Sequence, residues 1–196
     1  MSRHDHRVQR LDPQSLLGIA HPLRMRLLSS LREHGPATAS QLAGRLGESS
    51  GATSYHLRQL AAFGFVEDDP DRGTGRERWW RSAYDSTLVD DTSGMLDHAD
   101  PRVRGAFHLY QQEVAAYHAL EQANFLGSFL EWPAAWREAS ELSDFTLHLT
   151  ARQARELVER LHSVIAEYRD AAQGKDGSQP FRVHLHAFPH PPAPPE

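Results

Sequence analysis

Proline and glycine residues divide the first 64 residues of this chain into short helical segments. Two helix starts are marked by proline, at Asp12-Pro13 and at His21-Pro22. In each pair the proline suits the first turn of a helix, and it keeps the residue before it out of helical geometry. Gly35-Pro36 and Gly64 supply helix-stop signals. The signals from Asp12 to Pro36 limit each of the first two helices to about four turns. The region is therefore restricted to folds built from several short helices.

Two more helices and a β-hairpin are predicted after Gly35-Pro36. Thr38 and Gln41 fit a capping box, which marks a helix start. A turn rich in glycine and serine follows, and it supplies the cap of the next helix. Beyond Gly64 a segment dense in turn formers separates two runs of strand character. We expect helices over 38–46 and 51–63 and strands over 65–67 and 76–81.

Three short helices followed by a hairpin make up the winged helix-turn-helix arrangement. Residues 19–28 (IAHPLRMRLL), 54–60 (SYHLRQL) and 64–66 (GFV) resemble, in this order, the opening, the recognition helix and the helix exit of the ArsR-type regulators. The resemblance covers about residues 12–85. It implies a DNA-binding transcriptional regulator, a repressor in most of the family, that works as a homodimer on a palindromic operator.

The second helix of the predicted pair has the composition of a recognition helix. Such a helix directs its N-terminal residues toward base edges, where small polar side chains fit. Ser50, Ser54 and Arg58 lie four residues apart on one face. His56 has three possible roles: packing, a bond to a phosphate, or base reading. The hairpin adds arginines that can bind phosphates or reach into the minor groove. The predicted DNA-binding residues are Ser50, Thr53, Ser54, Tyr55, His56, Arg58, Arg72, Thr74, Arg76 and Arg78.

Charge divides the chain into two dissimilar parts. Residues 1–85 carry 12 arginines and 10 acidic residues, a formal charge of +2 (12 − 10). Residues 86–196 carry 9 basic and 16 acidic residues, a formal charge of −7 (9 − 16). This difference in sign indicates two roles, DNA binding for the first part and assembly or ligand sensing for the second.

Several functional classes find no support in the sequence. The chain has no cysteine, which excludes disulfides, thiolate metal sites and thiol catalysis. It has no HExxH, Walker or Rossmann glycine pattern, so we expect no enzymatic activity and no cofactor. No apolar run has the length of a membrane span, and we expect a cytoplasmic protein without a membrane partner.

The acidic part opens with a long helix, expected over about 101–130. Its apolar residues recur at spacings of 4, 3, 4 and 3, as in a coiled-coil seam. A seam of this kind would expose a large apolar patch on a monomer, which predicts a homodimer. The predicted interface residues are Val103, Phe107, Tyr110, Val114 and Tyr117.

Alternating apolar residues beyond this helix predict a strand over 145–149 and another over 181–188, on either side of a helix from Thr150 to about Ala172. The fold class is mainly α with small β: a winged helix-turn-helix domain, a helical dimerisation region and a strand-helix-strand segment. An apolar or aromatic effector could bind at Phe125, Phe129, Trp132 and Trp136, unless these rings only fill a core. The expected domains are a flexible tail (1–11), the DNA-binding domain (12–85), a linker (86–100), the dimerisation and effector region (101–188) and a Pro-rich tail (189–196).

A metal-responsive regulator is one alternative. Zinc sites on the dimer helix of ArsR-type proteins pair Asp-x-His with a later His-x-x-Glu, and this chain offers His108, His118 and Glu121. Ala106 stands where the aspartate is expected, and one residue is missing between the histidines, which rotates the second pair by about 100°. We therefore predict no metal site. A zinc or nickel sensor, or a winged helix that binds only protein, stays open.

Overall fold

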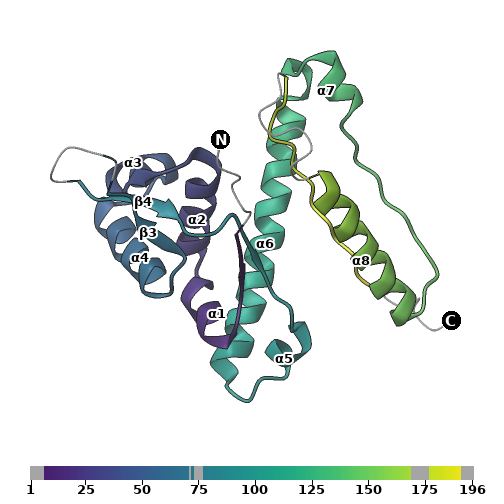
Figure 1. Cartoon of the computed structure of the whole chain (residues 1–196), viewed down its shortest axis with the longest axis horizontal. Coiled ribbons are helices and arrows are strands. Elements are labelled where there is room, and N and C mark those ends of the chain that lie inside the picture. The colour runs from purple at the N-terminus through teal and green to yellow at the C-terminus, as the bar shows by residue number, and fades with distance from the viewer. Residues whose placement is uncertain (1–6, 71, 73–76, 169–176, 191–196) are drawn as a thin grey trace. The chain divides into compact units, whose positions relative to one another are not determined.

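The computed structural model describes residues 7–70, 72, 77–168 and 177–190. By its internal contacts the chain divides into two compact units, Met1–Ala123 and Asn124–Glu196. Figure 1 labels the elements of both units along the chain.

Four helices begin the first unit, and local capping fixes where they start. Asp12 caps α1 by accepting the backbone N–H of Ser15 at 2.7 Å. His21 caps α2 with its ring, whose Nδ1 accepts the Leu23 N–H at 3.1 Å. The predicted capping box of α3 is present as well. The four helices are α1 (Pro13–Ile19), α2 (Pro22–His34), α3 (Ala39–Leu46) and α4 (Ser50–Ala62).

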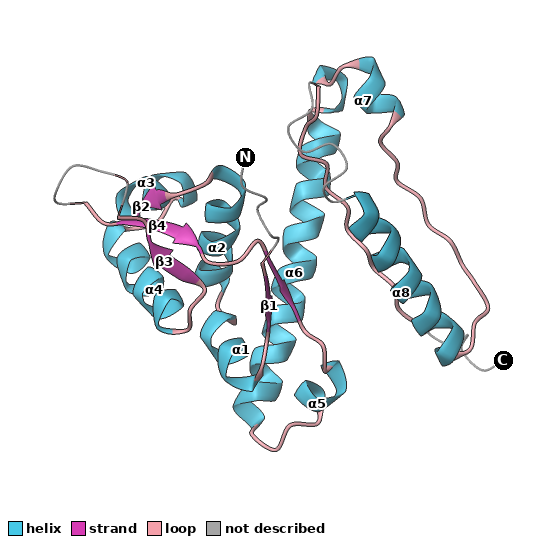
Figure 2. Cartoon of the chain, in the orientation of Figure 1, coloured by secondary structure: helices cyan, strands magenta, loops and turns pink. Residues whose placement is uncertain are grey.

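A small antiparallel sheet accompanies these helices. It consists of β2 (Ala37–Thr38), β3 (Val66–Asp68) and β4 (Trp79–Ser82) in the order β2-β4-β3. Figure 2 shows it in magenta beside α2, α3 and α4, with β3 and β4 forming the hairpin. Helices α3 and α4 followed by this hairpin are a winged helix-turn-helix, so the predicted fold class is confirmed for this part of the chain.

Residues 86–100 differ from the predicted linker, and residues 8–10 from the predicted flexible tail. β1 (Val8–Arg10) pairs in parallel with β5 (Ser86–Leu88), and α5 (Thr92–Leu96) follows. The reason is burial at both ends of this arrangement, since Leu11 and Met95 are only 5% and 3% exposed. Residues 86–100 are therefore an ordered connection, although their composition is typical of turns. Residues 1–6 of the predicted tail lie outside the described residues.

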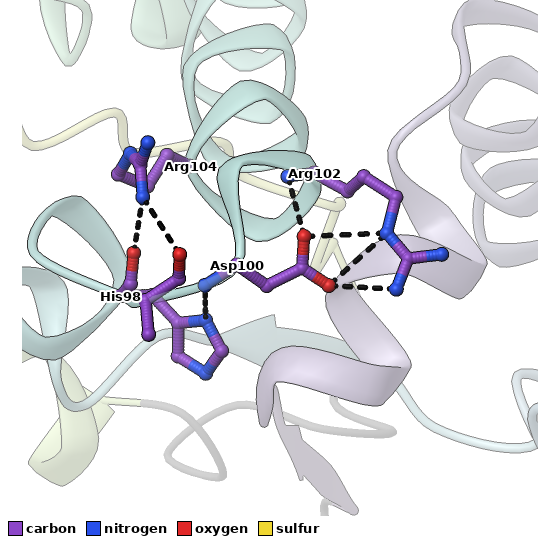
Figure 3. A network of polar contacts seen from close by, with 5 residues as sticks. His98, Asp100, Arg102 and Arg104 are labelled. Carbon is purple, nitrogen blue, oxygen red and sulfur yellow. Dashed lines mark hydrogen bonds and ion pairs between the residues drawn. The ribbon is translucent and has the colours of Figure 1, made fainter.

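The long helix α6 (Pro101–Gly127) starts from a network of polar side chains (Figure 3). The Asp100 carboxylate accepts the Arg102 backbone N–H at 2.8 Å and its guanidinium at 2.7 Å. His98 Nδ1 accepts the Asp100 N–H at 3.1 Å, and Arg104 donates to two carbonyls of the same turn. The hydrogen bonds from Arg102 lower the pKa of Asp100. The first turn of α6 is thus fixed locally.

The first unit has a single hydrophobic core. Leu27 of α2, Leu42 of α3 and Leu57 of α4 are fully buried, as is Phe65 beside the sheet. The same core includes Phe107 from the first half of α6. The N-terminal half of α6 therefore belongs to the fold of the winged helix-turn-helix unit.

The second unit contains short helices after α6 and one long amphipathic helix. They are η1 (Phe129–Glu131), α7 (Ala134–Glu138) and α8 (Ala151–Tyr168). The strands predicted over 145–149 and 181–188 are not formed. Their sequences have strand periodicity, but a strand also needs a partner for its backbone groups, and neither segment joins a sheet among the described residues. Residues 169–172 of the predicted helix and 191–196 of the predicted tail lie outside the described residues.

Among the described residues, no helix combines the length and the apolar character needed to cross a membrane.

Candidate nucleic-acid interface

The turn between α3 and α4 is fixed by a left-handed glycine and by an arginine from α2. Gly47 ends α3 with a φ of 68°, a conformation that favours glycine. Arg26 donates to the Leu46 carbonyl at 2.7 Å and to the Glu48 carboxylate at 3.0 Å. Ser49 then caps α4 by accepting a backbone N–H of its first turn. These hydrogen bonds fix the conformation of the turn and hence the orientation of α4 relative to α3.

Helix α4 has one buried and one exposed face. Leu57 and Leu60 point inward and are fully buried. Ser50 and Arg58 are exposed, Ser54 between them is half-buried, and Tyr55 is 51% exposed. The face with Ser50, Ser54 and Arg58 is thus the one that α4 offers to a partner.

Thr53 is a wrong prediction as a DNA contact. Its side chain is fully buried, because it lies four residues before Leu57 and shares the inward face of α4. Its hydroxyl finds no hydrogen-bond partner among the described residues. Thr53 therefore contributes to the packing of α4 on the core.

His56 packs against α2. Its ring centroid lies 4.3 Å from that of His21 and 5.0 Å from that of Tyr55. Its Nδ1 is buried without a hydrogen-bond partner. Burial lowers the pKa of both histidines, and the positive charges of Arg24 and of the facing histidine lower that of His56 further, against an opposing effect of Glu48. For His21 the corresponding opposing charge is Glu113 of α6.

We expect the stability of the first unit to fall as the pH drops below about 6.5, the ordinary histidine pKa. With folded pKa values below this, the unfolded chain binds protons first, so stability is full above 6.5 and is lost as pH falls toward the folded values. Protonation of His21 at Nδ1 would also remove the α2 cap. Denaturant unfolding at several pH values measures the effect. His56→Gln should flatten the pH dependence and Gln59→Ala should keep it; an equal slope in all three proteins contradicts the prediction.

The wing arginines are paired with carboxylates of the same hairpin. Arg78 Nε lies 2.9 Å from Asp68, and its guanidinium lies 4.1 Å from the centre of the Trp80 ring. Arg72 Nε lies 3.3 Å from Asp69. A phosphate would have to compete with these partners. Thr74 and Arg76, also predicted as contacts, lie outside the described residues.

Arg58 differs from these wing arginines. In the part of the chain that the structure describes, its guanidinium has no ion pair or hydrogen bond. It borders an open hollow where the start of α3, the exposed face of α4 and the entry to β4 meet. Sequence reasoning missed Ser40 at this place; its exposed position in the first turn of α3 was the available signal. The hollow is lined by Thr38, Ala39, Ser40, Ser54, Arg58, Glu77, Arg78 and Trp80.

Two members of the predicted dimer seam are wrong as interface residues. Val103 and Phe107 are each 2% exposed and lie in the core of their own chain. Their spacing places both side chains on one face of α6, and this face packs against the same chain. They therefore give no reason for a second copy to bind here.

The other seam residues also contact their own chain. The Tyr110 hydroxyl lies 3.3 Å from the Thr87 hydroxyl, and Val114 is half-buried. Tyr117 donates to the carboxylates of Glu33 and Glu121. Burial, and then these hydrogen bonds, raise the pKa of Tyr117. Through Tyr117 the seam thus contacts α2, and through Tyr110 it contacts β5.

The aromatic effector residues form paired contacts. Phe125 and Phe129 meet edge to face at 5.6 Å, and Trp136 stacks on Phe181 at 6.2 Å. Trp132 is 38% exposed. An effector site at these residues stays a prediction.

The low-ranking metal candidates are dispersed along α6. His108 and His118 are ten residues apart, about 15 Å along a helix axis, so one chain cannot bring both to one ion. His108 is exposed, and Glu121 accepts the Tyr117 hydroxyl at 2.9 Å. A site shared between two copies stays untested.

Comparison with known proteins assigns the class of the first unit. Residues 19–69 match the family model described as a helix-turn-helix domain, the domain type of DNA-binding transcription regulators. This confirms the resemblance as one confined to the N-terminal part. The sequence matches none of the curated proteins.

Solved structures similar to this chain include two regulators. One is the homodimeric winged helix-turn-helix DNA-binding domain of a possible ArsR-family regulator from Mycobacterium bovis, with 24% identity and a TM-score of 0.32 over 57% of this chain and 84% of the other. The other is the adhesin competence repressor of Streptococcus pyogenes, with 15% identity and a TM-score of 0.27 over 76% and 80%.

Proposed function

We propose that this protein is a sequence-specific DNA-binding transcriptional regulator, a dimeric repressor that reads a palindromic operator with α4. The observation that carries the proposal is the outward line of Ser50, Ser54 and Arg58, exposed at both ends and half-buried at Ser54, on a helix whose opposite face is fully buried. A helix held in this way can enter the major groove with small polar residues toward the bases.

The hollow beside α4 supports a phosphate contact next to this helix. It is lined by two guanidinium groups, Arg58 and Arg78, and by the hydroxyls of Ser40 and Ser54. The N-terminal end of α3 adds the positive end of a helix dipole. The Glu77 carboxylate would repel an anion here, so the attraction of the two arginines must exceed this repulsion. A DNA backbone lying across the hollow would place α4 against the groove.

Arg58→Ala is expected to weaken binding to the selected operator by about 5- to 150-fold, which corresponds to about 1–3 kcal/mol. The reason is that Arg58 is exposed on the proposed reading face and has no polar partner to give up among the described residues. The measurement is fluorescence anisotropy with a duplex obtained by selection from random sequences. The variant should also relax preference at one base position, and wild-type affinity should fall steeply with salt.

The matched control is Arg155→Ala, which removes an exposed arginine from α8 in the other unit. It should bind within about twofold of the wild type, since surface changes away from the interface have small effects. No binding of the wild type to any duplex at low salt would overturn the proposal and favour a winged helix that binds protein.

The palindrome follows from two-fold symmetry in the proposed dimer. Two copies of α4 would read half-sites about one helical turn of DNA apart. Footprinting on the selected operator tests this spacing, and transcription from an operator-controlled promoter tests repression.

A further inference from the structure

The second unit has no buried residue among its described positions, 124–168 and 177–190. Fourteen of its large apolar residues are more than a third exposed, and Phe145, Leu130 and Phe188 are each about four-fifths exposed (81%, 84% and 79%). The first unit, by contrast, has a continuous core. Apolar exposure on this scale marks an interaction surface.

Helix α8 is well formed but its apolar face is uncovered. Thr150 and Gln153 form a reciprocal cap at its start, with distances of 3.0 and 3.3 Å. Leu157, Leu161, Val164 and Tyr168 recur at helical spacing, and Val164 is 50% exposed and Tyr168 74%. Local signals thus specify the helix fully, while the packing partner that such a stripe requires is missing.

The segment before α8 is extended and unpaired. In residues 144–149, Phe145, Leu147 and Leu149 alternate with polar residues, which is the pattern of a half-buried strand. None of the backbone groups of 144–149 makes a backbone hydrogen bond within the described residues. An extended segment of this kind is a template for pairing with another strand.

Residues 169–176 read RDAAQGKD and residues 191–196 read PPAPPE, so neither contains a large apolar side chain.

The charge and the pattern of these segments favour a second copy of the same chain. Residues 151–168 hold three arginines and three glutamates, a formal charge of 0 (3 − 3), so two such helices meet without net repulsion. The neutral helix has no excess charge to attract a nucleic acid or an anionic membrane. An alternating strand paired with its own copy about a two-fold axis keeps its apolar side chains on one common face. A stable interface needs about 800 Å² per partner, and the fourteen exposed apolar residues provide a surface of this order.

We propose that the second unit is the dimerisation surface of this protein, in which the apolar face of α8 packs on a second copy and segment 144–149 pairs with a strand of that copy. This replaces the seam on α6 as the explanation of assembly. It rests on the proposed function only in that both require two copies, and the test below uses no DNA. Failure of the dimer surface and failure of DNA binding are therefore observed separately.

The experiment measures the mass of the full-length protein by light scattering and sedimentation at micromolar concentration. The wild type should have twice the monomer mass of 22.1 kDa. Val164→Glu puts a charge on the exposed apolar face and should weaken dimerisation about a hundredfold or more, while far-UV circular dichroism keeps its helix signal. Arg155→Glu, at an exposed position on the opposite face of the same helix, is the matched control and should stay a dimer.

Hydrogen exchange locates the interface independently. Amides of 145–149 should exchange slowly in the wild-type dimer and rapidly in Val164→Glu, because pairing protects them only in the dimer. A monomeric wild type, a Val164→Glu protein that dimerises as tightly as the wild type, or rapid exchange of these amides in a dimer would each overturn the proposal.

Discussion

Replacement of Phe107 by alanine is expected to lower the free energy of unfolding of the first unit by about 3–5 kcal/mol. The side chain is 2% exposed and lies in the core shared with α1, α2 and α4. Its removal loses the transfer free energy of a large ring and leaves a cavity that the surrounding helices can only partly close. Denaturant unfolding followed by circular dichroism measures the change.

His108→Ala, at the neighbouring exposed position, is the control and should change stability by less than about 0.5 kcal/mol. The comparison also decides between two roles of the α6 seam. A core residue changes the unfolding free energy at every protein concentration, whereas an interface residue changes the dimer dissociation constant. An unchanged unfolding free energy with a weakened dimer would restore Phe107 to the interface.

The winged helix-turn-helix was predictable from sequence because its information is local. Asp12, Thr38 and Ser49 cap the helices they precede, and Gly47 ends α3 in the left-handed conformation that its sequence position predicts. Each of these signals involves residues within one turn of helix. Such signals specify where elements begin and end without knowledge of the tertiary structure.

The α6 seam was misassigned because periodicity does not say what covers an apolar face. Val103 and Phe107 have the spacing of a coiled coil, and that spacing serves equally well for packing on helices of the same chain. Thr53 shows the same limit on a smaller scale, since its polar character indicated exposure while its position four residues before Leu57 placed it inside.

The pairing of the wing arginines and the absence of the C-terminal strands could not be predicted from sequence for a different reason. A paired arginine must exchange its carboxylate for a phosphate when it binds DNA, and the pairing of Arg78 with Asp68 depends on the register of the hairpin. The strand pattern of 145–149 is real, yet a strand forms only with a partner. Both features depend on contacts between segments that composition and periodicity do not specify.

Ser50→Glu is expected to reduce affinity for the operator duplex by about a hundredfold or more while leaving the fold intact or slightly more stable. Ser50 is exposed at the first position of α4, on the face proposed to read the major groove. A carboxylate there faces the phosphates of the duplex, and like charges brought together at an interface cost several kcal/mol. The same carboxylate interacts favourably with the N-terminal end of the helix dipole, by about 0.3–1 kcal/mol.

The opposite signs of these two effects make the variant informative, because a loss of binding cannot then be attributed to unfolding. Ser50→Gln is the matched control, as it has nearly the same size without the charge. It should bind more tightly than Ser50→Glu, and the difference between the two should shrink at high salt as screening weakens the repulsion. Equal affinities of the glutamate and glutamine variants, measured by anisotropy at low salt, would mean that the N-terminus of α4 does not face the DNA. The exposed line of Ser50, Ser54 and Arg58 would then lose its role as the reading face.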